Sequence, residues 1–159
     1  MPPLHHREPG PVGAAASDDR VTLEIIADGV HLNPTVVRVA FQAAPGRIAL
    51  VTDAMAAAGA ADGSYDLGSL SVEVVDGIAR LAVGGAIAGS TLTQDAALRC
   101  AVASGVSVVD AVAALTRVPA RAIGRQKDLG ALAPGMLADA VLLSPALQVR
   151  AVWVAGALV

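Results

Sequence analysis

Two apolar segments, with an amphipathic segment between them, dominate the first third of the chain. Val21–Ala27 is rich in β-branched residues and Ile48–Thr52 is mostly aliphatic, so both segments predict buried strands. Between them, Asn33 followed by Pro34 is typical of a helix start, and this helix is predicted to run through Phe41. Together the three elements predict a βαβ unit, and the continuous apolar runs indicate a parallel sheet covered on both faces.

After residue 62 the hydrophobic pattern becomes shorter and alternates. Val72–Val75 and Ile78–Leu81, separated by Asp76-Gly77, predict a hairpin with a tight turn. Thr91–Gln94 has the residues of a capping box, which predicts a helix that starts there and runs to about Ser104.

The remaining predicted elements lie after residue 106 and in the first ten residues. Ser107 opens a further predicted helix, which Pro119 interrupts because proline lacks an amide donor. Two strands are predicted over Ala140–Leu143 and Val149–Val154. The proline-rich opening, residues 1–10, predicts a loop.

Length and composition narrow the choice of fold and of partner. The chain has 159 residues, 55% of them hydrophobic, so it can bury a core. It is too short for a complete eight-stranded α/β barrel, which needs about 200 residues or more. A net charge of −3, scattered basic residues and an aromatic content of 2% argue against a nucleic-acid partner.

The same composition argues against a membrane protein. The longest uncharged stretch, Leu81–Gln94, covers 14 residues and contains Gly, Ser and Thr, so it cannot span a bilayer. No secretory signal is recognisable at the start. The single cysteine, Cys100, excludes an internal disulfide and a cysteine-based zinc cluster, and we expect it to be packed rather than reactive. A cytoplasmic location is therefore expected.

Asp53 is the first candidate for chemistry. It follows an apolar strand, and parallel α/β folds place reactive groups at the carboxyl ends of their strands. Partial desolvation of a carboxylate there would raise its pKa and suit it to general base catalysis. The structural alternative is that Asp53 caps a helix over Ala54–Ala58.

The segment Asp28-Gly29-Val30-His31 follows the neighbouring predicted strand. It would bring an imidazole to the same rim of the sheet as Asp53, and histidine is well suited to orient a substrate near neutral pH. The alternative is a structural histidine satisfied within a loop.

Two further segments could contact a ligand. Arg7, in the proline-rich loop, suits a phosphate or carboxylate, although pairing with Glu8 is an equal possibility. Ile87-Ala88-Gly89 precedes a predicted helix, and its small residues would let backbone amides approach a ligand, with ordinary capping as the alternative. A metal site at the adjacent His5 and His6 is disfavoured because their side chains point apart in an extended chain.

Taken in order, five segments resemble one family, the N-acetylglucosamine-6-phosphate deacetylases of the amidohydrolase superfamily. They are HHREPGPVGA, IIADGVHLNP, ALVTDAMAAAG, AIAGSTLT and LGALAPGMLADAVLLS. The last of them is widespread in the superfamily, whereas the combination of ADGVH, LVTDA and AGSTLT is specific.

The resemblance implies an α/β fold: the C-terminal part of a (β/α)8 amidohydrolase barrel with part of a small β-sandwich domain. The corresponding division of the chain is residues 1–62 (last barrel strands and substrate loops), 63–90 (hairpin and loop), 91–128 (helices packing on the barrel) and 129–159 (strands of the small β domain).

The resemblance also implies the reaction: hydrolysis of N-acetylglucosamine 6-phosphate to glucosamine 6-phosphate and acetate. Asp53 matches the family's catalytic aspartate, which accepts a proton from metal-bound water and delivers it to the departing amine. His31 matches the histidine beside the scissile amide, and Arg7 matches the phosphate-binding arginine. Asp28–His31 and Ile87–Gly89 match further sugar contacts.

At the metal site, this chain departs from the pattern of the family. The family binds a divalent metal, of zinc or iron type, through an early Glu and two His, and the last of these His lies in a His-Leu-x-Asn-Ala-Met segment whose Met corresponds to Met1. This chain is therefore expected to lack the metal ligands, to correspond to the C-terminal part of the enzyme, and to be inactive alone.

An open strand edge should follow, because Val21–Ala27 would lack a neighbour. We therefore expect a homo-oligomer, or association with the missing N-terminal part. Two other functions stay open: a non-catalytic sugar-phosphate-binding or assembly module, and another metal-dependent amidohydrolase.

Overall fold

The computed structural model describes residues 4–159 of the chain. Met1, which the resemblance matches to the Met of the family's His-Leu-x-Asn-Ala-Met segment, therefore lies outside the described residues. Its centre is a pair of parallel strands, β1 (Leu23–Ile25) and β2 (Ile48–Leu50), with Leu23 opposite Ile48. Helix α2 (Pro34–Ala43) connects them. The predicted βαβ unit is confirmed, although both strands are shorter than the apolar runs that predicted them.

The start of α2 follows from its sequence. The Asn33 side chain accepts a hydrogen bond from the backbone N–H of Thr35 at 2.9 Å, and Pro34 occupies the first helical position. This is the cap that the sequence predicts. The inward face of the helix carries Val37, which is completely buried.

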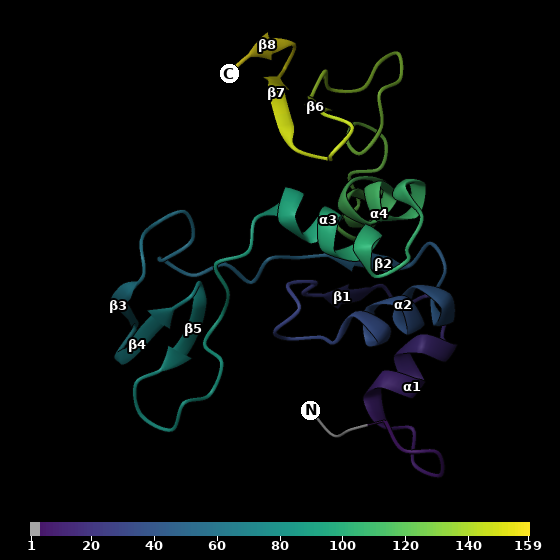
Figure 1. Cartoon of the computed structure of the whole chain (residues 1–159). Coiled ribbons are helices and arrows are strands. Elements are labelled where there is room, and N and C mark those ends of the chain that lie inside the picture. Colours follow the sequence, from purple (N-terminus) through teal and green to yellow (C-terminus); the bar gives the residue numbers. More distant parts are fainter. Residues whose placement is uncertain (1–3) are drawn as a thin grey trace.

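Three more helices complete the central part: α3 (Gln94–Ala103), α4 (Val108–Leu115) and α5 (Arg117–Ala122). In Figure 1, α3 and α4 lie above the strand pair and α2 lies below it. The main core takes residues from all of these elements except α5: Ile25, Ala27, Val37, Ala44, Ile48, Leu50, Leu98, Ala101, Val106, Ala111 and Ala114.

Burial differs between the two strands. All three residues of β2 are buried, so this strand is covered on both faces. In β1, Ile25 is buried but Glu24 is exposed, so one face of β1 meets solvent. The predicted coverage of both faces therefore holds for β2 only.

The predicted capping box at Thr91–Gln94 is not formed. Helix α3 begins at Gln94 after Thr93, whose side chain caps no backbone amide and instead donates to the Asp95 carboxylate at 2.6 Å. The Thr91 hydroxyl donates to the carbonyl of Gly77, at 2.6 Å, in a different part of the fold. The Thr91 side chain, which the local pattern predicts as a helix cap, thus makes a tertiary contact instead.

Pro119 accounts for the break between α4 and α5. Ser107 caps α4 by accepting the N–H of Asp110 at 3.1 Å, as predicted. The helix ends at Leu115, four residues before Pro119, whose ring and missing N–H are incompatible with continuing the α4 hydrogen bonds. The interruption predicted at Pro119 is confirmed.

Two three-stranded antiparallel sheets lie outside the central part. The first contains β3 (Gly63–Leu67), β4 (Leu70–Val75) and β5 (Ile78–Leu81), so the predicted hairpin is confirmed and gains β3 as a third strand. It stands to one side in Figure 1 and has a small core of its own, built from Met55, Ala57, Val72, Val74, Ala79 and Ala88.

The second sheet contains β6 (Ala140–Leu143), β7 (Val149–Val154) and β8 (Ala157–Leu158). It lies beyond α3 and α4 in Figure 1, and Leu143 and Leu147 pack against the main core. No helix among residues 4–159 is both long enough and apolar enough to cross a membrane.

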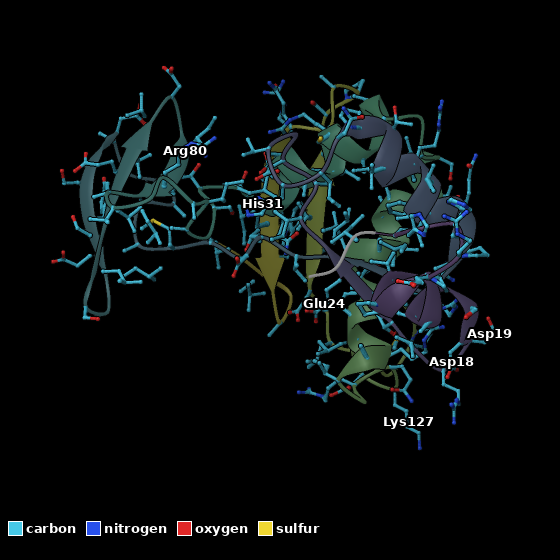
Figure 2. All side chains as sticks on the ribbon, turned by 90° about the horizontal axis from the view of Figure 1, so that it is seen from below. Asp18, Asp19, Glu24, His31, Arg80 and Lys127 are labelled. Carbon is cyan, nitrogen blue, oxygen red and sulfur yellow. The ribbon has the colours of Figure 1, made fainter. Side chains whose placement is uncertain are left out.

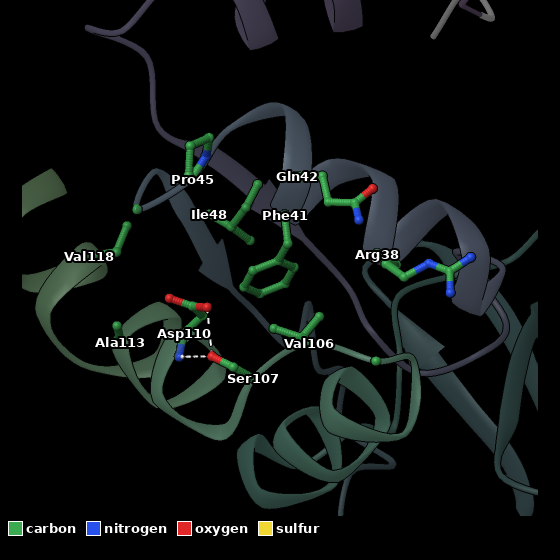
Figure 3. Close-up of a pocket in the computed structure, with 12 residues that line it drawn as sticks. Arg38, Phe41, Gln42, Pro45, Ile48, Val106, Ser107, Asp110, Ala113 and Val118 are labelled. Atoms are coloured by element: carbon green, nitrogen blue, oxygen red, sulfur yellow. Dashed lines mark hydrogen bonds between the residues drawn. The ribbon is translucent and has the colours of Figure 1, made fainter.

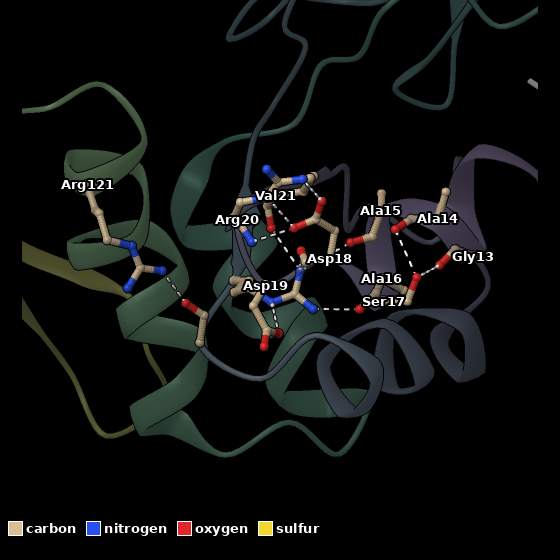
Figure 4. A network of polar contacts seen from close by, with 12 residues as sticks. Gly13, Ala14, Ala15, Ala16, Ser17, Asp18, Asp19, Arg20, Val21 and Arg121 are labelled. Atoms are coloured by element: carbon tan, nitrogen blue, oxygen red, sulfur yellow. Dashed lines mark hydrogen bonds and ion pairs between the residues drawn. The ribbon is translucent and has the colours of Figure 1, made fainter.

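The hydrophobic pattern does not predict the first helix, α1 (Gly10–Ser17), which buries no residue. The helix is held instead by Arg47, a buried side chain just before β2. Its guanidinium donates to the carbonyls of Ala15 and Ala16 at 3.2 and 2.5 Å, and to those of Asp18 and Val21 at 2.9 and 2.8 Å. Figure 4 shows these four accepting residues converging at the end of α1.

Replacing Arg47 with Met is expected to lower the free energy of unfolding by about 2–4 kcal/mol, because four carbonyls lose a charged donor while the volume is largely kept. Urea unfolding measures the loss. Arg20→Met is the matched control, since Arg20 is 89% exposed and its ion pair with Asp18 is screened by water. Equal stability of the two variants would contradict the role given to Arg47.

Candidate active site

Two candidate segments meet at one edge of the central sheet. Asp28–His31 follows β1 and Asp53 follows β2. Because β1 and β2 are parallel neighbours, their carboxyl ends open on the same side. Figure 2 shows His31 on the side of the central part that faces the β3–β5 sheet, whereas Asp18 and Asp19 lie at the opposite end. The sequence-based juxtaposition of the two strand ends is therefore present.

The Asp28 carboxylate organises the loop after β1. One of its oxygens accepts the backbone N–H groups of Val30 and His31, each at 2.8 Å. The other lies 2.7 Å from Nδ1 of the His31 ring. The side chains of Asp28 and His31 are 12% and 20% exposed, so both partners are largely shielded from water. Gly29, with φ of 77°, supplies the left-handed turn that lets one carboxylate reach both amides.

The charge of Asp28 determines which ring nitrogen of His31 carries a proton. Burial raises the pKa of Asp28, but the hydrogen bonds from the His31 and Val30 amides and from the His31 ring together hold that pKa below its ordinary value. An ionised carboxylate only accepts hydrogen bonds, so Nδ1 of His31 carries a proton. The other ring nitrogen, Nε2, is thereby left for a ligand.

Asp53 has an unusual backbone and an exposed position. Its φ is 49°, in the left-handed region that residues other than glycine seldom occupy. No helix follows it, because residues 56–59 form turns, so the alternative of a helix cap is wrong. The desolvation expected from the sequence is also wrong, because Asp53 is exposed. Exposure leaves its carboxylate accessible to a ligand.

Ile87–Gly89 lies against the same edge. The next residue, Ser90, donates its backbone N–H to the carbonyl of Asp53 at 2.8 Å, which brings the whole segment beside the end of β2. Gly89 has φ of 67°, and a Cβ there would lie 3.0 Å from the Asp53 carbonyl oxygen. Only glycine allows this approach. Ser90 lies in the AGSTLT segment that carries the resemblance, but the local pattern assigns it no role, because its partners Thr52 and Asp53 are distant in the sequence.

The loop that carries Arg7 is not joined to this edge. Its hydrogen bonds are local: Arg7 N–H to the His5 ring at 3.3 Å, and Glu8 N–H to the His5 carbonyl at 3.1 Å. Within residues 4–159, no ion pair forms between Arg7 and Glu8 and no hydrogen bond uses the Arg7 guanidinium. Figure 1 places this loop below α1. The guanidinium remains available to an anion.

A divalent metal, which members of the amidohydrolase family generally use, does not fit the described part of the chain. Among those residues no group of three or more His, Cys, Asp or Glu side chains could hold a metal ion. His31 could offer a single ligand, Nε2, because its Nδ1 bonds to Asp28. The His5 and His6 rings do not point apart, as an extended chain predicts, but lie with their centroids 4.3 Å apart. Burial raises the pKa of the half-buried Cys100 thiol, which fits the packed role expected for it.

A pocket between two helices lies away from this edge. It measures about 170 Å³, and Figure 3 shows it between α2 and α4, with Phe41, Val106 and Asp110 in its wall. Pro45 and Gly46, which precede β2, also line it, so it opens at the amino end of the strand pair, opposite to Asp53. None of the candidate site residues lines this pocket.

Comparison with known proteins gives the family. The amidohydrolase family model matches residues 4–159. An Escherichia coli K12 protein with a provisional name, N-acetylgalactosamine-6-phosphate deacetylase, is 45% identical over 99% of this chain and 95% of its own length. The N-acetylgalactosamine-6-phosphate deacetylase of E. coli O157:H7 is also 45% identical, over 99% of this chain but only 42% of its own length.

Solved structures agree with the sequence comparison. A variant of the Mycobacterium smegmatis N-acetyl-D-glucosamine-6-phosphate deacetylase, in complex with N-acetyl-D-glucosamine-6-phosphate, superposes with a TM-score of 0.91 at 45% identity. This chain matches 42% of that structure, so it spans less than half of two of the three relatives. Since the family model extends over nearly the whole sequence, the chain belongs to the amidohydrolase family of hydrolases.

Proposed function

We propose that the protein containing this chain hydrolyses the N-acetyl group of N-acetylglucosamine 6-phosphate, giving glucosamine 6-phosphate and acetate. The observation that carries the proposal is the parallel pairing of β1 and β2, which opens the loops of Asp28–His31 and Asp53 on one edge. The relatives named as amino-sugar phosphate deacetylases support the substrate class.

The proposed reaction requires a proton carrier. Water must add to the amide carbonyl, and its proton must reach the departing nitrogen. We assign this transfer to the carboxylate of Asp53, which is exposed and held beside Ile87–Gly89. Nε2 of His31 would hydrogen-bond the acetamide group, because Nδ1 is committed to Asp28.

The sugar contacts follow from the segments that surround this edge. The backbone of Asp28, Gly29, Val30 and His31 and that of Ile87, Ala88 and Gly89 would bind the sugar, and Arg7 would bind the phosphate. A divalent metal, generally used by this family, would activate the water, but we assign none of its ligands to the described residues.

The same proposal extends to architecture and assembly. We propose that β1–α2–β2 is the last part of a (β/α)8 barrel, and that the C-terminal strands belong to a small β-sandwich domain. Within the described residues β1 pairs only with β2, so its other edge is unpaired. An unpaired edge favours association with further strands, from a second copy or from an N-terminal part of the protein.

A second candidate substrate is N-acetylgalactosamine 6-phosphate. The E. coli relatives named for this sugar are as similar to the chain, at 45% identity, as the M. smegmatis enzyme named for N-acetylglucosamine 6-phosphate. The two sugars differ only in the configuration of one hydroxyl, so both should be assayed side by side. Acetate release from one sugar but not the other decides between the candidates.

Asp53→Asn, made in the complete protein that contains this chain, is expected to lower kcat by about 10²–10⁴-fold, since the proton carrier is lost while shape is kept. Acetate release from both sugar phosphates measures the effect. Asp66→Asn, an exposed aspartate on β3, is the matched control and should leave kcat unchanged.

The outcomes of this assay separate the functions left open by the sequence. A wild-type protein that binds the sugar phosphates without releasing acetate would favour a non-catalytic module. A wild-type protein that neither binds nor hydrolyses either sugar phosphate would favour another amidohydrolase. Full activity of Asp53→Asn would remove Asp53 from the mechanism.

Arg7→Gln is expected to raise the KM for the phosphorylated sugar by about 10-fold or more, because a charge-assisted contact to phosphate is lost. The KM for unphosphorylated N-acetylglucosamine, measured in the same assay, should be unchanged. Arg20→Gln, an exposed arginine at the other end of α1, serves as the control. A parallel change in both KM values would show that Arg7 does not contact the phosphate.

Asp28→Asn tests the electrostatics of the β1 loop through stability. Because the pKa of Asp28 is lowered on folding, its contribution is present above the unfolded value of about 3.9 and is lost as pH falls through the folded pKa. The free energy of unfolding of wild type should therefore exceed that of Asp28→Asn by about 1–2 kcal/mol at pH 7, and this difference should shrink as pH falls below the unfolded value. Urea unfolding against pH measures it; a difference independent of pH would contradict the assignment.

A further inference from the structure

We propose that Ser90 is a positioning residue for Asp53: it fixes the backbone from which the catalytic carboxylate projects. This inference rests on the role proposed above for Asp53. Ser90 does not have to touch the substrate, and its effect would be transmitted entirely through hydrogen bonds to the residues around Asp53.

Ser90 makes four hydrogen bonds to the chain on both sides of itself and of Asp53. Its N–H donates to the Asp53 carbonyl at 2.8 Å, and its carbonyl accepts the N–H of Met55 at 2.9 Å. Its hydroxyl donates to the Thr52 carbonyl and accepts the N–H of Leu92 at 3.0 Å. Ser90 is 4% exposed, so water does not replace these bonds easily. One buried serine is thus hydrogen-bonded to the backbone of Thr52, Asp53 and Met55.

The backbone that Ser90 holds is one that would otherwise relax. Asp53 has φ of 49°, a conformation that is strained for a residue other than glycine and persists only where the surroundings impose it. Moving Asp53 to an ordinary φ would swing its Cβ, and with it the carboxylate, away from the present direction. The hydroxyl bond to Thr52 holds the residue just before this strained position.

Two neighbours of Ser90 make the arrangement rigid. Gly89 permits the close approach, since a Cβ there would lie 3.0 Å from the Asp53 carbonyl oxygen and 3.3 Å from the Met55 Cβ. Thr91 donates its hydroxyl to the Gly77 carbonyl at 2.6 Å, which ties the same segment to the β4–β5 turn. Ser90 therefore sits at the point where the central sheet, the β3–β5 sheet and the candidate site are joined.

Positioning of this kind affects the chemical step more than binding. Proton transfer needs the carboxylate at a defined distance from both water and nitrogen, and a misplacement of about 1 Å can cost on the order of 100-fold in rate. Substrate binding would rest on other groups, His31 and Arg7 among them. Loss of the Ser90 hydroxyl should consequently lower kcat and leave KM nearly unchanged.

The test compares three variants in the complete protein that contains this chain. Ser90→Ala removes only the two hydroxyl bonds, and kcat per folded enzyme is expected to fall about 10–100-fold with KM within about threefold. Ser90→Thr keeps the hydroxyl and should recover most of kcat. Ser104→Ala is the matched control, because Ser104 is also buried and donates its hydroxyl to a backbone carbonyl, that of Cys100 at 2.7 Å.

A second readout does not depend on activity. Hydrogen exchange of the Met55 amide, whose acceptor is the Ser90 carbonyl, should quicken in Ser90→Ala and not in Ser104→Ala. Unchanged kcat in Ser90→Ala, an effect on KM alone, or equal loss in Ser90→Thr would overturn the proposal. If Asp53→Asn is inactive and Ser90→Ala is normal, only this inference fails, whereas an active Asp53→Asn removes the role proposed for Asp53, and a wild-type protein that releases no acetate removes the proposed function.

Discussion

The parallel pairing of β1 and β2 is the constraint on which the rest of the structure depends. Each strand contributes only three residues, with Leu23 opposite Ile48 and Ile25 opposite Leu50. The pairing fixes the direction in which both strands end, so the loops after them must open at the same edge. It also places Ile25, Ile48 and Leu50 in one layer, onto which α2, α3 and α4 pack their apolar residues.

Such short strands form few hydrogen bonds with each other, and polar side chains supply further connections. Arg47 binds four carbonyls at the end of α1, and Ser90 binds the backbone on both sides of Asp53. Both are buried side chains whose hydrogen bonds go to backbone groups, and Arg47 also forms an ion pair with the exposed side chain of Asp19 at 3.5 Å. Within residues 4–159, no buried side-chain nitrogen or oxygen lacks a hydrogen-bond partner, which keeps the desolvation cost of these groups low.

The candidate site separates two electrostatic tasks. Asp28 is largely shielded and satisfied by three hydrogen bonds, so it serves as a fixed negative partner for His31. Asp53 is exposed and strained, so its carboxylate can meet a ligand. Two carboxylates of the same βαβ unit thus differ in role because one is committed within its own loop and the other is not. This division is the physical basis for assigning orientation to the first and proton transfer to the second.

The local elements follow from residues close together in the chain: the Asn33 cap, the βαβ unit, the hairpin turn and the interruption at Pro119. The amidohydrolase membership follows from short segments spread along the whole sequence. Tertiary structure decided the features that depend on distant partners. Thr91 bonds to Gly77 instead of capping α3, α1 is held by Arg47 from beyond α2, and Ser90 reaches back to Thr52 and Asp53. Local propensity acts over one or two turns of chain, whereas these hydrogen bonds join residues 14 to 38 positions apart and exist only once the chain has folded.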